Sequence, residues 1–340
     1  MKFRKRETPP ERVYRQILVN ARHSQLKLTQ ANLRRLMRTF DDAAESIAQQ
    51  LIDIPGVYLG PEGALSQAAM RETLRNIDTL LASLARDYAN LLDAGMLQVA
   101  QAAADREQEI GRFTGAPNDP GLQAEIDRTV MTADGLEVTV RFGRVSGTAV
   151  ERLASRYYRD GLRLSDRLYN LDAITRRVIE DTLIQGVTEG ASARKVAGRL
   201  VDNLTAAGSA NPGFHAMRIA RTELNNAHRE AHLLSVLTPE GAMKEWVQGV
   251  RWNLSLGHKD PDICDIYASH EAGLGAGVYL PRDVPTDHPH GLCHLTTVLK
   301  AYPDVYGPGK QPQPFDVPES QIAYYADRLN DPVAQAALSG

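Results

Sequence analysis

The sequence predicts a mainly α-helical protein in which long amphipathic helices precede a small, loop-rich α+β domain. Two observations predict this class. Apolar residues recur every three or four positions over most of the chain before residue 238, which is the period of a helix with one buried face. Beyond Pro239 the pattern changes to short alternating segments separated by Gly, Pro, Asp and His. The composition, with 43% apolar and 24% charged residues, is typical of a folded chain and disfavours disorder, collagen and a membrane bundle.

The 340 residues correspond to about two domains, and such a chain buries a core without disulfides. No run of 18 apolar residues is present, and the polar start from Met1 to Arg6 has no apolar segment behind it. We therefore expect synthesis in the cytosol, with neither a secretory leader nor a membrane partner. Two cysteines cannot make a disulfide framework, so a metal site or a plain core role is favoured over a bridge.

Two long helices are predicted first. A stripe of apolar residues predicts a helix from Pro10 to Ile54, which Pro55 and Gly56 end because proline cannot continue the hydrogen-bond ladder. A second stripe alternates steps of four and three from Met70 to Leu91. Two such stripes bury each other best as an antiparallel pair or as part of a bundle, so we interpret them as core rather than as a ligand site.

A turn-rich linker at 115–121 separates this part from a β-hairpin predicted between Val130 and Phe142, around Asp134-Gly135. Helical periodicity returns from Thr148 to Leu237 in four pieces, broken near Leu171, at Gly190 and across 207–213. A Trp-containing strand follows Pro239. Prolines between 303 and 318 then predict an extended tail, followed by a short helix through Tyr324 and Leu329.

We therefore divide the chain into five parts. They are a helical N-terminal region with a basic arm (1–128), a β-hairpin connector (129–147), a helical middle domain (148–237), a small His/Cys-rich α+β domain (238–300), and a Pro-rich tail with a terminal helix (301–340).

The formal net charge of −3 argues against a nucleic-acid coat, but the charge is unevenly distributed. Eleven lysines and arginines and only two acidic residues lie within residues 1–38. A basic arm on an acidic body predicts an anionic partner, either nucleic acid or an acidic protein surface, although a solvated helix face explains it equally well. The candidate partner-binding residues are Arg4, Lys5, Arg6, Arg12 and Arg15.

The segment from His258 to His294 holds both cysteines and five of the nine histidines. One zinc ion takes about four such ligands, and it would stabilise a loop-rich segment by cross-linking it. The alternatives are two buried thiols that pack as small apolar groups among polar histidines, and a disulfide. There is no paired Cys-x-x-Cys, so counting cannot select the ligands. The candidates are Cys264, His288, His290, Cys293 and His258.

No catalytic residue is predicted. A metal-bound water beside an Asp would support hydrolysis, but the segment offers no helix-borne His-x-x-x-His pair, and the chain carries no P-loop or Gly-x-Gly-x-x-Gly fingerprint.

A polar stripe on one predicted helix is a second candidate site, because it could seat a neighbouring loop, the alternative being a solvated face. Its residues are Arg218, Arg221, Thr222, Glu223 and Asn226.

Several short motifs follow one another between Thr148 and Leu299. They are Arg221-Thr222-Glu223 with Asn226-Ala227, the Trp-containing strand, Leu254-Ser255, His258 through Pro261-Asp262-Ile263-Cys264-Asp265, Gly277-Val278-Tyr279, and His288-Pro289-His290 with Cys293. In this order they resemble the phage head morphogenesis family of Mu F-like minor head proteins. The family's closing motif reads His-Pro-x-Cys-x-Cys, whereas this chain has Gly291 at the earlier thiol. The resemblance therefore implies either an incomplete zinc site or a ligand taken from His290, His294 or His258.

The resemblance implies a low-copy virion protein of a tailed phage, incorporated during head assembly at the portal vertex or in the capsid interior, without enzymatic activity. Its expected partners are the portal protein and the major capsid protein, and its expected role is in genome packaging or ejection. Packaged double-stranded DNA is a further expected partner through the basic arm. A metal-dependent nuclease packaged in the virion and a DNA-binding portal adaptor are the alternatives.

Overall fold

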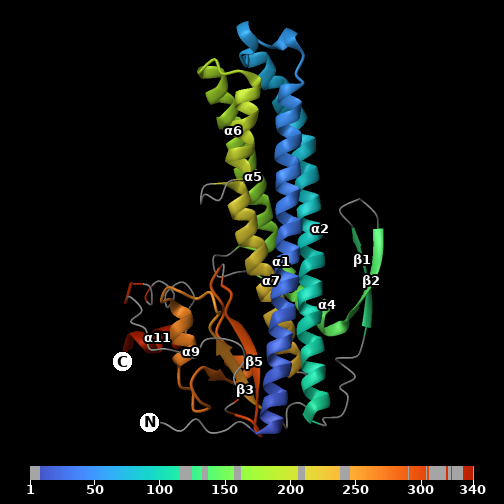
Figure 1. The fold of residues 1–340 in the computed structure, drawn as a ribbon. Helices are drawn as coiled ribbons and strands as arrows, with labels where there is room; N and C mark the ends of the chain where they lie inside the picture. The colour runs from blue at the N-terminus through green and yellow to red at the C-terminus, as the bar shows by residue number, and fades with distance from the viewer. Residues whose placement is uncertain are drawn as a thin grey trace.

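The computed structural model describes residues 8–114, 125–131, 137–156, 162–205, 211–237, 246–289, 291–303, 305, 319–320, 323 and 332–339. In this part the protein is mainly helical, with a small three-stranded antiparallel sheet near the C-terminal end. The predicted fold class is therefore confirmed. Figure 1 shows a tall helical body with the small domain packed against its lower end.

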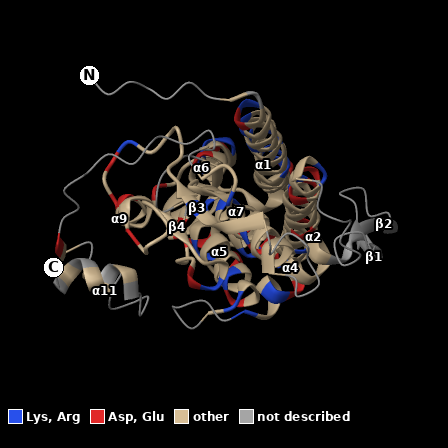
Figure 2. Cartoon of the chain, turned by 90° about the horizontal axis from the view of Figure 1, so that it is seen from below, with Lys and Arg blue, Asp and Glu red and all other residues tan. Residues whose placement is uncertain are grey.

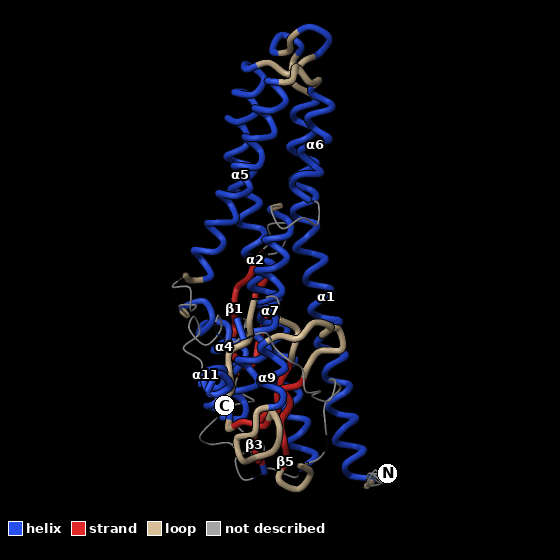
Figure 3. Tube along the Cα trace, turned by 90° about the vertical axis from the view of Figure 1, so that its left-hand side faces the viewer, coloured by secondary structure: helices blue, strands red, loops and turns tan. Residues whose placement is uncertain are grey.

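The two longest helices form the body's backbone. α1 (Pro9–Ile52) and α2 (Gln67–Thr114) run antiparallel along its full height (Figure 1). α1 begins at a capping box in which the Thr8 side chain accepts from Glu11 N–H and the Glu11 side chain accepts from Thr8 N–H. The predicted stripes face each other: Phe40 stacks edge-on against Tyr88 at 5.6 Å. Two short 3-10 turns, Gly56–Tyr58 and Pro61–Gly63, join the helices at the tip that Figure 3 shows farthest from the strands.

Four further helices in the described residues pack beside this pair, in agreement with the four helical pieces predicted between Thr148 and Leu237. They are α4 (Arg144–Ser155), α5 (Leu164–Thr188), α6 (Ala193–Thr205) and α7 (Pro212–Leu237). The break predicted near Leu171 is wrong, because Leu171 is buried inside α5 and the helix begins at Leu164 instead. The Asp166 carboxylate accepts the Arg163 N–H at 2.7 Å, which fixes that start. The break at Gly190 is confirmed, with φ +61° directly after the α5 C-cap.

Two helical glycines are expected to respond in opposite ways to alanine. A Cβ at Gly186 in α5 would lie 2.4 Å from Val196 Cγ2 on α6, whereas a Cβ at Gly198 meets nothing within 4 Å. We expect Gly186→Ala to destabilise the protein by about 1–3 kcal/mol through overpacking, and Gly198→Ala to stabilise it by up to about 1 kcal/mol through helix propensity. Urea unfolding measures both. Equal effects of the two substitutions would contradict the close approach of α5 and α6.

The predicted hairpin is present with different bounds. β1 (Glu125–Met131) pairs antiparallel with β2 (Glu137–Gly143), and α4 begins directly at Arg144. The connector predicted at 129–147 is therefore wrong at both ends: the hairpin starts earlier, and the connector's last residues already belong to α4.

The small domain is built on one sheet of order β4-β3-β5. Its elements are β3 (Val247–Asn253), α9 (Ile263–Ser269), β4 (Val278–Tyr279), the 3-10 turn Pro281–Asp283, β5 (His294–Leu299) and α11 (Pro332–Ser339). Seen from below, β3 and β4 lie between α9 and α7 (Figure 2). The predicted Trp-containing strand is β3. The tail's prolines from 308 to 318, and the helix predicted through Tyr324 and Leu329, lie outside the described residues.

The hydrophobic core does not follow the predicted division of the helical part. One cluster of buried side chains runs from Leu36 on α1 through α2 and α4–α6 to Ala231 on α7, so 1–128 and 148–237 share a core. A second cluster, centred on Trp252, belongs to the small domain and includes Val236 of α7. Tyr14 and Leu299 join a third cluster in which the start of α1 meets β5. None of the described helices is long and apolar enough to cross a membrane.

A buried polar network fastens the sheet to the helices. Arg106 on α2 pairs with Glu107 at 2.7 Å, and its Nη2 donates to Nδ1 of His232 on α7. Thr297 on β5 donates its hydroxyl to Glu107 Oε2 at 2.7 Å and lies 3.2 Å from His232 Nε2. Because Nδ1 of His232 accepts, Nε2 carries the ring proton and donates to Thr297. Tyr14 on α1 donates to the Thr297 carbonyl at 2.5 Å. Polar contacts from three helices therefore meet on one strand.

Two imidazoles of α7 are expected to make stability depend on acidity. Burial, together with the charges of Arg106 and other arginines, holds the pKa values of His228 and His232 well below 6.5. Below that pH the unfolded chain binds more protons than the folded one, so stability falls as pH decreases. Each imidazole contributes a slope of up to about 1.4 kcal/mol per pH unit. We expect His228→Asn to flatten the decline in unfolding free energy between about pH 6.5 and 5.

The control for this prediction is His23→Asn, which removes an exposed imidazole on α1. Its pH profile should match that of the parent protein. An unchanged slope in His228→Asn would show that the buried imidazole does not govern the acid sensitivity.

Candidate metal centre

The centre begins with the cap of α9. The Asp262 side chain accepts the Cys264 N–H through Oδ1 at 2.7 Å, and the Asp265 carboxylate accepts the Asp262 N–H at 2.8 Å, which forms a capping box. Capping holds Oδ1 of Asp262 at the helix start and leaves its Oδ2 facing His288, 3.1 Å from Nε2. Cys264, in the first turn of the helix, is fully buried.

Asp262, Cys264 and His288 bring one ligand atom each within 4.8 Å of the others. Nδ1 of His288 lies 3.0 Å from the Pro289 carbonyl, where it can only donate, so Nε2 is the nitrogen available to a cation. Tetrahedral zinc with bonds of 2.0–2.3 Å separates its ligand atoms by about 3.3–3.6 Å. A carboxylate, a thiol and an imidazole at these positions fit zinc chemically, and they would hold it between α9 and the loop before β5.

Cys293 and His258 lie next to this group and contact each other. Hydrogen bonds with Cys264 and His258 lower the pKa of the Cys293 thiol to about 6, although its burial opposes this. The same contact with Cys293, and a 2.8 Å contact with Asp265 Oδ2, raise the pKa of His258 to about 9. His258 also belongs to a separate group with Asp262 and Asp265. Asp262 therefore lies at the point where the two groups meet.

Protons compete with a cation at this centre. Burial opposes the charged form of His288, but the hydrogen bond with Asp262 and the Asp287 charge outweigh it and raise its pKa to about 9. Burial, and the hydrogen bond with Cys293, raise the pKa of the Cys264 thiol well above its usual value. Binding zinc through these two groups releases protons, so the affinity rises with pH.

Of the five predicted ligands, Cys264 and His288 belong to the compact group, and Cys293 and His258 lie beside it. His290 lies outside the described residues. Asp262 was not predicted as a ligand, although an aspartate two positions before a cysteine was a visible signal. Cys264 and Cys293 are free thiols, so the disulfide alternative does not describe this structure.

The loop that carries His288 is held by α1 and α7. Asn225 Nδ2 donates to Asp287 Oδ2 at 2.9 Å and to the Cys293 carbonyl at 3.3 Å. Arg22 donates to the Leu292 carbonyl at 2.7 Å. Arg229 donates to the Pro285 carbonyl at 3.0 Å, and its guanidinium lies 4.2 Å from the centre of the Trp252 ring.

The polar stripe predicted on α7 does not include the α7 residues that make these contacts. Thr222 donates back to the Arg218 carbonyl, and Glu223 is fully buried 3.9 Å from Arg167. Arg218 is exposed, Arg221 is half-buried, and Asn226 is buried beside the pocket described next. Because Thr222 to His228 are all buried, a solvated face is wrong for this part of α7; Asn225 and Arg229 are the residues that seat the loop.

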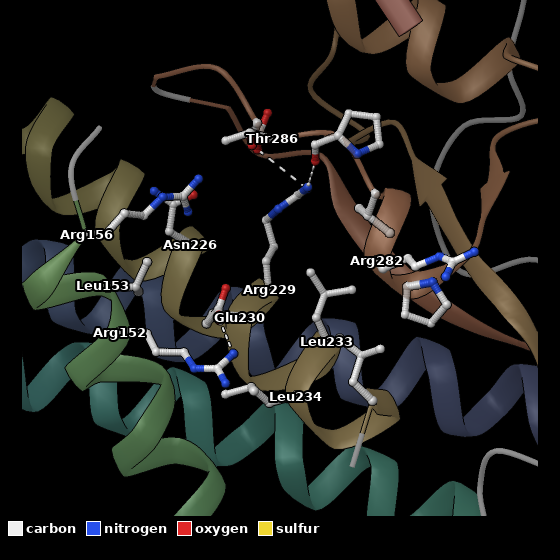
Figure 4. Close-up of a pocket in the computed structure, with 15 residues that line it drawn as sticks. Arg152, Leu153, Arg156, Asn226, Arg229, Glu230, Leu233, Leu234, Arg282 and Thr286 are labelled. Atoms are coloured by element: carbon white, nitrogen blue, oxygen red, sulfur yellow. Dashed lines mark hydrogen bonds and ion pairs between the residues drawn. The ribbon is translucent and has the colours of Figure 1, made fainter. Parts of the chain in front are cut away.

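A pocket of about 410 Å³ opens between α4, α7 and the segment 281–287 (Figure 4). Four arginines line it: Arg152 from α4, Arg156 directly after α4, Arg229 from α7, and Arg282. Arg152 pairs with Glu230 at 3.3 Å, and Arg229 extends from α7 toward the loop, where its Nη1 lies 3.9 Å from Asp287 Oδ2 (Figure 4). The guanidinium groups outnumber the carboxylates, so the pocket suits an anionic group.

Fold and site together define a helical protein that carries a small α+β domain with a Cys/His/Asp group that could hold a metal ion. Comparisons of the chain with protein-family models, with curated proteins and with solved structures found no match.

Proposed function

We propose that this chain is a structural protein of a tailed-phage head, of the minor head protein class, and that one zinc ion stabilises its C-terminal domain. The observation that carries the proposal is the position of the metal centre. Its ligands join α9 to the loop before β5, and α1 and α7 hold that same loop through Arg22 and Asn225. A cation there cross-links the small domain at the place where it meets the helical body.

Two features support a docking role. The arginine-lined pocket suits an acidic group on a partner, for which we propose the portal protein or the major capsid protein. Figure 3 shows the tip formed by residues 53–66 at the opposite end of the helical body from β3 and β5, so we propose that the two ends make separate contacts. The motif order from Arg221 to Cys293 supports the assignment to the head, and virion localisation follows from it.

Incorporation into heads tests this function. Heads assembled with a tagged copy of this chain should contain it at low copy, and a pull-down during assembly should recover portal and major capsid protein. Absence from finished heads would overturn the proposal.

The metal-dependent nuclease is the rival function, favoured by the three carboxylates of Asp262, Asp265 and Asp287 near two imidazoles. Plasmid nicking that chelation and His288→Ala both abolish would establish the rival.

The N-terminal arm is the proposed contact with packaged double-stranded DNA. Arg4, Lys5 and Arg6 lie outside the described residues, whereas Arg12 is exposed and Arg15 half-buried at the start of α1. The basic character continues along the helix, because no acidic residue lies between Glu11 and Asp41. Exposed cations in that stretch are Arg12, Lys27, Arg34, Arg35 and Arg38.

Charge reversal of the arm should weaken DNA binding. Substituting Arg4, Arg6, Arg12 and Arg15 by Glu is expected to lower affinity for duplex DNA and DNA retention in heads. The slope of log affinity against log salt should become shallower by about 0.9 for each phosphate that the arm no longer neutralises. A matched control reverses four exposed cations elsewhere, namely Arg71, Arg86, Arg194 and Lys195. If both variants bind and package DNA as the parent does, the arm contacts no DNA.

A further inference from the structure

We infer that Asp287 is a fourth ligand of the metal centre, and that residue 291 is glycine because the Asp287 carboxylate occupies the space of any side chain there. The inference rests on the proposed zinc centre. It extends that proposal because Asp287 was not among the predicted ligands.

The two oxygens of Asp287 have different surroundings. Oδ1 lies 3.7 Å from Cys264 Sγ and 4.0 Å from His288 Nε2, the two donors that define the group together with Asp262. The first separation is close to an edge of a zinc tetrahedron, about 3.3–3.6 Å, and the second is longer. The Asp287 side chain is only 3% exposed, so it is not a surface acid that happens to lie near a cluster.

The other oxygen is held from outside the centre. Oδ2 accepts from Asn225 at 2.9 Å and lies 3.9 Å from Arg229 Nη1, so α7 fixes the orientation of the carboxylate. Oδ1 accepts the His288 N–H at 2.9 Å. A carboxylate oxygen has two acceptor positions, and the second one on Oδ1 accepts from the Cys264 thiol. Zinc binding through Cys264 removes that proton and so frees the position for a cation. Outer contacts of this kind orient metal-binding carboxylates.

Gly291 provides the independent observation. A Cβ there would lie 2.5 Å from Asp287 Oδ1 and 2.6 Å from Oδ2, so any side chain at this position would force the carboxylate to move. The backbone does not require glycine, because Gly291 is not among the glycines with positive φ. A side chain at residue 291 would therefore displace the Asp287 carboxylate from its present position beside Cys264 and His288. In this chain residue 291 has no side chain, and the carboxylate beside the centre is that of Asp287.

The exchange of these two positions tests the inference. The full-length protein is stripped with a chelator and titrated with Co²⁺, which reports thiolate ligands by near-ultraviolet charge-transfer absorption, and zinc affinity is then measured by competition. Asp287→Asn keeps the size and an acceptor oxygen, and we expect it to weaken zinc binding by at least about tenfold. Gly291→Ala should weaken it as well, because its Cβ displaces the carboxylate. Asp260→Asn, an exposed acid of the same segment, is the matched control and should bind as the parent does.

The double variant Asp287→Ala/Gly291→Cys places a thiol where the carboxylate was. We expect it to bind zinc more tightly than Asp287→Ala and to show stronger charge-transfer absorption with Co²⁺ than the parent. Parent-like zinc affinity in Asp287→Asn, or no gain in the double variant, would overturn the ligand role of Asp287 while leaving the centre intact. A parent protein that binds neither ion would overturn the proposed centre itself, and this outcome is distinct from the other two.

Discussion

Cys264→Ala is expected to remove bound zinc and to cause a large loss of thermal stability in the small domain. The purified parent protein should contain about one zinc per chain. A ligand present at a thousandfold excess over its dissociation constant adds about 4 kcal/mol to the unfolding free energy, and this contribution disappears when Cys264 is absent. Elemental analysis and thermal unfolding with and without chelator measure the two effects.

The chelator separates metal loss from the packing effect of a buried substitution. With chelator present, the melting temperatures of the parent and Cys264→Ala should approach each other, because only the small packing difference remains. His270→Asn changes an imidazole of the same domain that stacks on Tyr279 outside the group, and it should retain zinc. A parent protein with almost no zinc, or one whose melting temperature chelation leaves unchanged, would contradict this prediction.

Glu107→Ala is expected to destabilise the whole protein by about 3–5 kcal/mol. The Glu107 side chain is fully buried and is the carboxylate that pairs with Arg106, which is itself only 5% exposed. Removing it leaves a guanidinium buried without its partner and the Thr297 hydroxyl without its acceptor. Because Thr297 lies on β5, the substitution also weakens the attachment of the small domain to α2. Urea unfolding measures the change in free energy.

Two comparisons make this test specific. Glu109→Ala removes an exposed carboxylate from the same helix and should change stability by no more than about 0.5 kcal/mol. The double variant Arg106→Met/Glu107→Leu removes both charges, and we expect it to be more stable than Glu107→Ala because no buried charge is left unpaired. A parent-like unfolding free energy in Glu107→Ala would show that the buried pair does not hold the domain in place.

The helices could be predicted because their signals are local. The stripe from Leu33 to Leu51 on α1 and the one on α2 are contiguous in sequence, and a helix repeats its buried face every three or four residues. The break near Leu171 was misplaced because periodicity does not mark where a helix starts. Leu171 lies on the buried face of α5, and the capping contact of Asp166 with Arg163 marks the start of that helix. Periodicity identifies helices better than it identifies their ends.

The site could be predicted only in part. Thiols and imidazoles concentrated between His258 and His294 indicated a metal centre, and Cys264 and His288 belong to its compact group. The segment between them is mostly loop, so spacing along the chain does not determine which donors meet. The Asp262 carboxylate is held in the group by a helix cap, and a hydrogen bond from α7 holds the Asp287 carboxylate beside it. The contact of Asp287 with α7 cannot be derived from the order of residues in that segment.

The sequence by itself determined the helical class, the two long amphipathic helices, the basic N-terminal end and the concentration of cysteine and histidine between residues 258 and 294. Each of these depends on composition or on short-range periodicity, which the chain carries before it folds. Only the tertiary structure decided that the helical parts share one core, that Glu107 and His232 fasten β5 to α2 and α7, and that Asp287 lies beside both Cys264 and Gly291. Those contacts join residues far apart in sequence, and their energies depend on burial and distance, which exist only after the helices have packed.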